Sequence, residues 1–401
     1  MLEKNIDLQK KRILVTGAAG FIGAGLVSEL MKRYPGCKII GIDNMNNYYD
    51  PRIKEYRLDR IAQEAAYDDQ FELVRGSIAD RDTVERVFRE YKPEIVVNLA
   101  AQAGVRYSIE NPDAYIESNL IGFYNILEAC RHSYDIDCSD RGTDASSVGA
   151  DEKNAMGDMS AGGASSDSTE MAEAVFGNYR GVEHLVYASS SSVYGNGKKI
   201  PYSVDDKVDN PVSLYAATKK SNELMAYAYS KLYGIPSTGL RFFTVYGPAG
   251  RPDMAYFGFT DKLLNGETIK IFNYGNCRRD FTYIDDIVEG VISVMQTSPL
   301  ENENGVRYKV YNIGNNDPVN LLDFVDILQQ ELVSAGVLPS DYDFEAHKEL
   351  VPMQPGDVEV TYADVSALQE DFGFKPDTPL REGLRRFAAW YREFYRMRMD
   401  S

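Results

Sequence analysis

Residues 12–23 read RILVTGAAGFIG, and they are the most informative segment of the chain. The first half is a short, β-branched and apolar run, which predicts a buried strand. The second half spells G-x-x-G-x-x-G at Gly17, Gly20 and Gly23, with Phe21 and Ile22 opening a helical apolar repeat. A strand, a glycine turn and a helix N-terminus favour a bound phosphate pair, because free N–H groups and the helix dipole attract an anion.

A second β-rich run at 37–42 ends in Asp43, which lies about 20 residues beyond Gly23. An acid at this place binds the 2′,3′-diol of a ribose and repels a 2′-phosphate. The pattern therefore predicts a dinucleotide site that prefers NAD to NADP, with Asn44 directly beside the acid.

Strands and helices alternate over the first 247 residues. This rhythm predicts an α/β fold, a Rossmann-type doubly wound parallel sheet. Beyond Gly247 the pattern loosens into shorter elements, which predicts a smaller C-terminal substrate-binding lobe. We therefore divide the chain into 1–247 and 248–401, with a helix at about 284–297 returning to the first domain. The further strands are expected at 71–74, 94–100, 182–188 and 236–242, and the helices at 51–66, 80–91, 112–132, 213–233 and 319–335.

Residues 134–181 interrupt the alternation. They are rich in Asp, Ser, Gly and Ala, and their three bases and ten acids give a net charge of 3 − 10 = −7. Such a composition has little apolar surface to bury, so we interpret the segment as a solvated, partly disordered insertion with one short helix near 168–177. A partner-binding role is the alternative.

Replacing residues 138–168 by a short Gly/Ser linker is expected to leave the melting temperature nearly unchanged, because flexible surface loops contribute little to stability. A thermal unfolding scan of the deletion variant beside the full chain measures this. A large drop in melting temperature would show that the segment packs on the body.

Composition restricts the class of partner. The formal net charge of −18 argues against nucleic acid or an anionic membrane surface as the main partner. Four cysteines show neither metal-ligand spacing nor a disulfide framework, and three histidines form no recognisable catalytic arrangement, so no metal site is expected. The first residues lack a signal-peptide core and no apolar run approaches about 18 residues, which together predict a cytoplasmic protein without a membrane span.

Tyr215 and Lys219 are four residues apart on an expected helix, so they share one face. Tyrosine, with a pKa of about 10, is a poor base at neutral pH, but nearby positive charge favours the phenolate. Ser190 ends the strand at 182–188, where such sheets place their ligands, and could donate to a substrate oxygen. An ordinary surface pair is the alternative for Tyr215 and Lys219, and turn chemistry is the alternative for Ser189, Ser191 and Ser192.

Taken together, the glycine turn, Asp43, the serine run before Val193-Tyr194-Gly195 and the Tyr215/Lys219 pair resemble the extended short-chain dehydrogenase/reductases that act on nucleotide sugars. The resemblance covers nearly the whole chain except 134–181. Several further stretches are similar to the UDP-glucuronate 4-epimerases of that family: 43–50, 100–108, 241–248, 250–255, 279–283 and 354–358.

The resemblance implies tightly held NAD, a UDP-sugar substrate gripped by the smaller lobe, and a homodimer built through the helices at about 112–132 and 213–233. Tyr215 would be the base, Lys219 its support on the nicotinamide ribose, and Ser190 the donor to the sugar oxygen. Arg279 would clamp the diphosphate, and Asp357 would contact the ribose or pair with Arg279. Thr244 and Arg251 would contact the sugar carboxylate. A surface role is the alternative for both arginines. The remaining implied residues are, for the cofactor, Gly17, Gly20, Phe21, Ile22, Gly23, Asp43, Asn44, Ser77, Ile78, Leu99, Ala100, Ala101 and Gln102, and, for the substrate, Arg106, Ser191 and Ser192.

Some positions depart from the family pattern or separate its members. Ser77 stands where the family usually has Asp near the adenine, and Ala249 stands where these epimerases usually carry Trp. Relatives that eliminate water place Asp-Glu at the positions of Ser191 and Ser192, and UDP-glucuronate decarboxylases usually have Glu at the second. Serines at both positions leave no acid–base pair for elimination. The alternatives that stay open are a 4-epimerase of UDP-glucose or UDP-N-acetylglucosamine, and a non-catalytic NAD-binding regulatory protein.

Overall fold

The computed structural model describes residues 1–67, 69–136, 179–197, 199–353 and 358–399. Most of the expected insertion, including the short helix near 168–177, lies outside the described residues. Asp357 lies outside them as well. The expectations for these positions therefore stay predictions.

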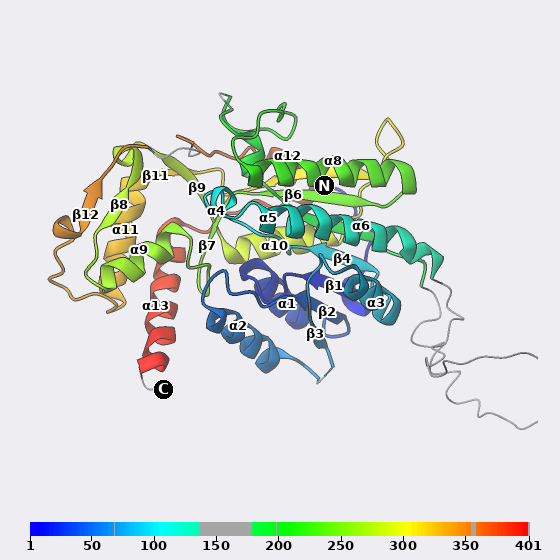
Figure 1. The fold of residues 1–401 in the computed structure, drawn as a ribbon, viewed down its shortest axis with the longest axis horizontal. Coiled ribbons are helices and arrows are strands. Elements are labelled where there is room, and N and C mark those ends of the chain that lie inside the picture. Colours follow the sequence, from blue (N-terminus) through cyan, green and yellow to red (C-terminus); the bar gives the residue numbers. More distant parts are fainter. Residues whose placement is uncertain (68, 137–178, 198, 354–357, 400–401) are drawn as a thin grey trace, which may run out of the picture.

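A seven-stranded parallel sheet forms the centre of the molecule (Figure 1). Its strand order is β10-β6-β5-β4-β1-β2-β3, and every neighbouring pair is parallel. The reversal of strand order between β1 and β4 opens a crevice at the carboxyl ends of the strands, where α/β folds bind their ligands. The strands are β1 (Arg12–Thr16), β2 (Lys38–Asp43), β3 (Phe71–Arg75), β4 (Ile95–Asn98), β5 (His184–Ser190), β6 (Ser237–Phe242) and β10 (Tyr308–Ile313).

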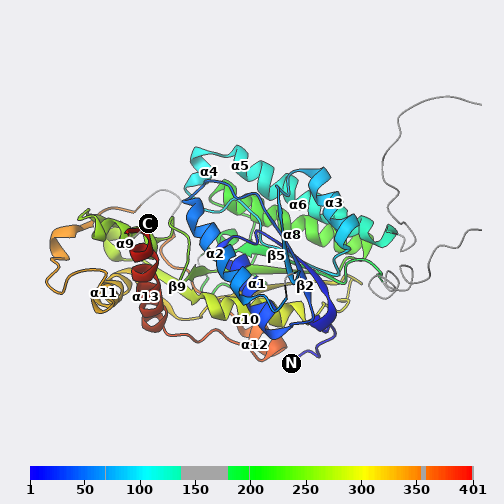
Figure 2. The ribbon, with the colours of Figure 1, turned by 90° about the horizontal axis from the view of Figure 1, so that it is seen from below.

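Helices cover both faces of this sheet (Figure 2), as the continuous apolar strands require. Ile13 and Val15 of β1 join the core under one set of helices, and Leu14 between them joins the core under the other. The first set is α1 (Phe21–Arg33), α2 (Pro51–Glu64) and α10 (Ile284–Met295), and the second is α3 (Arg81–Tyr91), α6 (Gly122–His132) and α8 (Leu214–Tyr233). The predicted doubly wound sheet is confirmed.

The helix expected at 112–132 is not uniform. It consists of α5 (Asp113–Tyr115), a π-helical turn η2 (Ile116–Ile121) and α6, after the short helix α4 (Tyr107–Glu110). Asn119 lies in the π-helical turn, and its side chain bonds both the N–H (2.8 Å) and the carbonyl (3.0 Å) of Gln102. Such turns are rare and occur often at functional sites. Here the turn brings a buried amide against the segment that follows β4.

The smaller lobe contains two short sheets and three helices. One sheet has the order β11-β9-β7 and the other pairs β12 with β8. The seventh strand of the main sheet, β10, comes from within 248–401, which the sequence interpretation assigned to the lobe. The elements are β7 (Thr244–Tyr246), β8 (Ile269–Ile271), β9 (Arg278–Tyr283), β11 (Pro318–Asn320), β12 (Lys348–Leu350), α9 (Ala255–Leu264), α11 (Leu321–Ser334) and α13 (Leu380–Met399), with α12 (Ser366–Phe372) beside β10.

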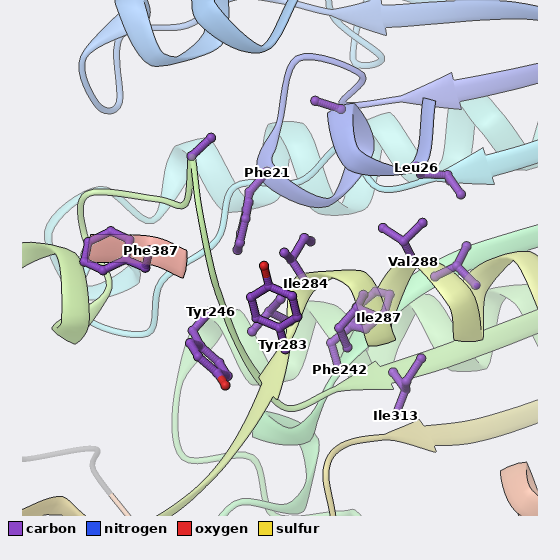
Figure 3. Packing of buried hydrophobic residues seen from close by; sticks show 14 of the residues in the cluster. Phe21, Leu26, Phe242, Tyr246, Tyr283, Ile284, Ile287, Val288, Ile313 and Phe387 are labelled. Carbon is purple, nitrogen blue, oxygen red and sulfur yellow. The ribbon is translucent and has the colours of Figure 1, made fainter. Parts of the chain in front are cut away.

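One hydrophobic core runs from the sheet into the lobe without a break. Figure 3 follows it from Val288 of α10 through Ile284 and Tyr283 to Tyr246 and Phe387 of the lobe. The Tyr246 and Tyr283 rings meet edge to face, with their centroids 5.7 Å apart. The lobe is therefore packed directly onto the helix α10 that covers the sheet.

Burial of one histidine makes stability depend on pH. His184 on β5 is fully buried, its Nε2 lies 2.9 Å from Thr238 Oγ1, and burial lowers its pKa to about 4. As the pH falls below about 6.5, His184 becomes protonated in the unfolded chain but stays neutral in the folded chain. The folded state therefore loses stability relative to the unfolded state until the pH reaches about 4. At 1.36 kcal/mol per pH unit the loss is roughly 3 kcal/mol. Denaturant unfolding at pH 7 and 4.5 measures it.

The matched control for this pH dependence is His184→Gln, which removes the titration. Asp280 acts in the opposite direction, because burial raises its pKa to about 6 despite three backbone N–H groups that favour its charged form. The difference between wild type and variant cancels the Asp280 contribution. An equal pH dependence in the two proteins would contradict the assignment to His184.

Among the described helices, none combines the length and the apolar composition that a membrane crossing needs. Within the same residues, no group of three or more His, Cys, Asp or Glu side chains is placed to hold a metal ion.

Candidate active site

A cleft opens along the carboxyl ends of the central strands, as strand order dictates. It joins the glycine turn after β1, the loop after β2, the segment after β4, the end of β5 and the N-terminal part of α8. The sequence-predicted residues that line it are Gly17, Gly20, Phe21, Ile22, Gly23, Asp43, Asn44, Ser77, Ile78, Leu99, Ala100, Ala101, Gln102, Ser190, Tyr215, Lys219 and Arg251.

The glycine turn has room for backbone only. A Cβ on Gly17, whose φ is +70°, would lie 2.9 Å from the Ala100 nitrogen. A Cβ on Gly23 would lie 2.1 Å from the Gly17 carbonyl oxygen. The turn packs closely and aims the first turn of α1 into the cleft, so its N–H groups and dipole fit a pyrophosphate.

The acid at the end of β2 is paired. Asp43 is buried and accepts hydrogen bonds from the backbone N–H groups of Ala19 (3.1 Å) and Met45 (2.9 Å). Lys54 of α2 is also buried, and its Nζ lies 3.4 Å from Asp43 Oδ1 and 3.0 Å from Asn46 Oδ1. The Asp43 side chain and the Lys54 ammonium both face the same part of the cleft, so acceptor and donor are available for a ribose diol.

Ser77 lies in the same part of the cleft as Asp43. Its Oγ accepts a hydrogen bond from the N–H of Ala79 at 3.1 Å. The hydroxyl still has its own proton, so Ser77 can donate a hydrogen bond to a ligand at the position where the family usually has Asp.

Tyr215, Ser190 and Lys219 meet at the bottom of the cleft. Burial raises the pKa of Tyr215, while a hydrogen bond with Ser190 and the charge of Arg251 lower it. Lys219 is buried, burial lowers its pKa to about 8, and its Nζ donates to the Ala188 carbonyl at 2.8 Å. The charge of Asp253 opposes that of Arg251, and the pKa of Tyr215 stays above its ordinary value. The role of Lys219 in supporting the tyrosine stays a prediction.

Arg251 reaches the cleft from the loop between β7 and α9. Its Nε donates to Asp253 Oδ1 at 2.9 Å, and its Nη2 donates to the other carboxylate oxygen. Tyr48, from the loop after β2, donates to Asp253 Oδ2 at 3.3 Å. The bidentate pair uses one edge of the guanidinium and leaves the remaining N–H groups of Nη1 and Nη2 for another acceptor.

The other expected substrate contacts do not line this cleft. Ser192 donates its backbone N–H to Ser190 Oγ at 3.1 Å, so the turn Ser191–Tyr194 supports the serine from below. The Arg106 guanidinium lies 5.1 Å from the centre of the Phe272 ring in the lobe. Arg279 donates to the backbone carbonyls of Arg278 and Glu359, both at 3.1 Å. Thr244 lies on β7, between Phe243 and Val245 of the cleft wall. Their substrate contacts stay predictions.

Several residues in or beside the cleft were missed by the sequence interpretation, among them Lys54 and Tyr48, which line it, and Asp253, which pairs with Arg251. The stretches 43–50 and 250–255, which contain Tyr48 and Asp253, were noticed, but the hydrogen bond between these two side chains and the pairing of Asp253 with Arg251 were not. The signal for Lys54 is one basic residue in the second turn of α2, which by itself is typical of a solvated helix face.

Comparisons with known proteins agree with this geometry. Residues 13–314 match the NAD dependent epimerase/dehydratase family. The chain is 43% identical over 396 residues to protein CapI of Staphylococcus aureus, covering 96% of this chain and 99% of that one. It is 39% identical over 393 residues to UDP-glucuronate 4-epimerase 4 of Arabidopsis thaliana, covering 96% and 76%.

Solved structures give the same picture. The UDP-glucuronic acid 4-epimerase of Bacillus cereus, in complex with UDP-glucuronic acid and NAD, matches with a TM-score of 0.72 and 28% identity, over 96% of this chain and all of that one. The UDP-glucose 4-epimerase of Thermotoga maritima with UDP-glucose matches with a TM-score of 0.71 and 25% identity, over 96% and 99%.

The family match, the fold shared with a structure that contains NAD, and the close-packed glycine turn all indicate the same cofactor, NAD. The chain belongs to the NAD-dependent epimerase/dehydratase family.

Proposed function

We propose that the protein is a UDP-glucuronate 4-epimerase, which interconverts UDP-glucuronate and UDP-galacturonate through a transient 4-keto sugar. The observation that carries this proposal is that Tyr215 and Arg251 line the same cleft. A base for the 4-hydroxyl and a cation for the C5 carboxylate then lie at neighbouring points of one sugar ring.

In this proposal Tyr215 accepts the proton of the sugar 4-hydroxyl, and Ser190 donates a hydrogen bond to the same oxygen. Bound NAD supplies the acceptor and donor of hydride at C4. Lys219 supports the tyrosine from the buried side of α8, anchored on the Ala188 carbonyl. The sugar turns over between the two hydride steps, so the residues that touch it must hold it weakly while UDP is held firmly.

Arg251 would also protect the intermediate. Oxidation at C4 makes a β-keto acid, which loses CO₂ when the bond to the carboxylate lines up with the ketone π system. A guanidinium that holds the carboxylate close to the ring plane keeps this bond misaligned. The same contact would therefore favour epimerisation over decarboxylation.

A UDP-glucose 4-epimerase is the second candidate, and Asp253 favours it. Because Asp253 neutralises Arg251 through two hydrogen bonds, the local charge of the cleft suits a neutral sugar as well as an acidic one. An acidic sugar must then use the N–H groups that Asp253 leaves free.

The test begins with an absorbance scan of purified protein for bound nicotinamide. The protein is then incubated separately with UDP-glucuronate and UDP-glucose, and the products are separated and identified. Conversion of UDP-glucuronate to UDP-galacturonate in preference to any reaction of UDP-glucose supports the proposal. Activity on UDP-glucose alone would overturn the substrate assignment.

We also propose that the protein forms a homodimer through η2, α6 and α8. These elements carry exposed apolar side chains. Among them are Ile121 at the end of η2, Tyr124 on α6, and Leu224 and Tyr227 on α8. The helices also pack on each other, so their outer faces adjoin.

Leu224→Glu is expected to convert the dimer into a monomer, because it places a charge in the middle of the proposed apolar interface. Light scattering after size-exclusion chromatography measures the mass. The matched control is Leu300→Glu, which changes an equally exposed leucine far along the chain (70% exposed, against 60% for Leu224). A dimeric Leu224→Glu variant would contradict this interface.

A further inference from the structure

Arg57, on α2, is buried to 4% exposure and uses every N–H of its guanidinium. Nε and Nη2 donate to the Ala249 carbonyl at 2.9 and 2.7 Å, and Nη2 also donates to the Gly250 carbonyl at 3.0 Å. Nη1 donates to the Ala19 carbonyl at 2.9 Å and to the Tyr49 hydroxyl oxygen at 2.7 Å.

These partners are four backbone contacts and a phenol, not a carboxylate. A buried charge is costly unless it is well hydrogen-bonded, and a simple apolar residue would fill the same space at no such cost. The planar, fixed fork of arginine is suited to holding several acceptors at set positions. This arrangement therefore indicates that Arg57 serves to fix the relative positions of the backbone segments that it bonds.

Arg57 joins three segments that are distant in sequence. Ala19 belongs to the glycine turn of the cofactor site, and Tyr49 belongs to the loop that begins at Asp43. Ala249 and Gly250 come directly before Arg251.

The loop that Arg57 holds is in a constrained conformation. Ala249 has φ of +52°, which is unfavourable for a residue with a side chain and persists only where neighbours enforce it. A Cβ on Gly250 would lie 1.7 Å from the Tyr256 hydroxyl, so the chain passes through a narrow gap there. The Ala249 carbonyl accepts two hydrogen bonds from Arg57, and these bonds hold the loop in this conformation.

We propose that Arg57 is a positioning residue that sets the place of Arg251 relative to the cofactor turn, and thereby governs recognition of the acidic sugar. This inference rests on the proposed function. Arg57 acts through the carbonyls of residues 249 and 250 and has no direct contact with the sugar in this scheme.

The experiment compares Arg57→Gln and Arg57→Lys with Arg60→Gln. Arg60 lies on the same helix, its side chain is 49% exposed, and it pairs with Glu64 at 3.5 Å, so it is a matched control. In Arg57→Gln we expect kcat/KM for UDP-glucuronate to fall about 10²-fold, the usual result of a displacement of about 1 Å at a reacting centre. Affinity for UDP alone should stay within about twofold, because in the proposed function other parts of the lobe, around Arg279, hold the nucleotide.

Two further readouts separate positioning from general support of the fold. Amide hydrogen exchange of residues 247–254 should be faster in Arg57→Gln than in wild type and unchanged in Arg60→Gln. Arg57→Lys, which has three N–H donors, should restore part of the UDP-glucuronate activity.

Equal losses of UDP and UDP-glucuronate affinity would overturn the proposal, as would unchanged exchange in the 247–254 segment of Arg57→Gln. Should the glutamine variant fail to fold, the lysine variant carries the same comparison. If wild-type protein shows no preference for UDP-glucuronate, the proposed function fails, and the exchange measurement alone still decides whether Arg57 positions the loop.

Discussion

Tyr215→Phe is expected to lower kcat by about two to four orders of magnitude, the usual contribution of a general base. The substitution removes the hydroxyl that lies beside Ser190 and keeps the ring. That ring meets Tyr115 edge to face, with centroids 6.0 Å apart, so its packing should survive. UDP-sugar binding should therefore change little, which calorimetric titration with UDP-glucuronate measures beside the steady-state rate.

The control for this substitution is Tyr227→Phe, at an exposed position of the same helix (40% exposed). It should retain the wild-type rate. Unchanged turnover in Tyr215→Phe would exclude Tyr215 as the base, and loss of binding in step with turnover would assign it a structural part instead.

Arg251→Ala is expected to raise the KM for UDP-glucuronate by about 10- to 150-fold, which corresponds to the ~1.5–3 kcal/mol of a hydrogen bond to a charged group. The variant also leaves Asp253 without its cationic partner, and this carboxylate would repel the carboxylate of the sugar. Binding of UDP-glucose should stay about as it was. Some UDP-4-keto-pentose should leak out, because nothing then holds the carboxylate away from the ketone π system.

Mass spectrometry of the products with both substrates measures these effects. The double variant Arg251→Ala/Asp253→Asn is the informative control, since it removes the repulsion together with the cation and should regain part of the lost affinity. Equal losses on UDP-glucuronate and UDP-glucose would show that Arg251 supports the loop and does not recognise the acid.

Local pattern was enough to predict much of the fold. Gly17, Gly20 and Gly23 mark a turn that tolerates no side chain, and the β-branched runs at 12–16 and 37–42 mark buried parallel strands. Strand β10 was missed because its pairing with β6 joins residues about 70 positions apart, and nothing in 308–313 states which sheet it joins. The π-helical turn was missed because its apolar spacing resembles that of an ordinary helix.

The site divides in the same way. Ser190, Tyr215 and Lys219 were expected in one cleft from spacing and strand ends, and the structure places them there. Lys54 and Asp253 escaped because their importance lies in a contact with another segment, to Asp43 in one case and to Arg251 and Tyr48 in the other. A charged residue gives no sign in sequence of the partner that it meets.

The unbroken core between sheet and lobe restricts how substrate preference could be exchanged between relatives. A chimaera joined at a single point near residue 247 would pair Val288 and Ile284 of one parent with foreign side chains on α1, and it would also import β10 into a sheet that it did not evolve with. Recombination should instead keep the packing between α1 and α10 intact and exchange the 249–254 loop together with Arg57 of α2 and Tyr48 of the loop after β2, which bond to it. Under the proposed function, such a transplant would carry Arg251 with the residues that hold it and leave the contact between α1 and α10 unchanged.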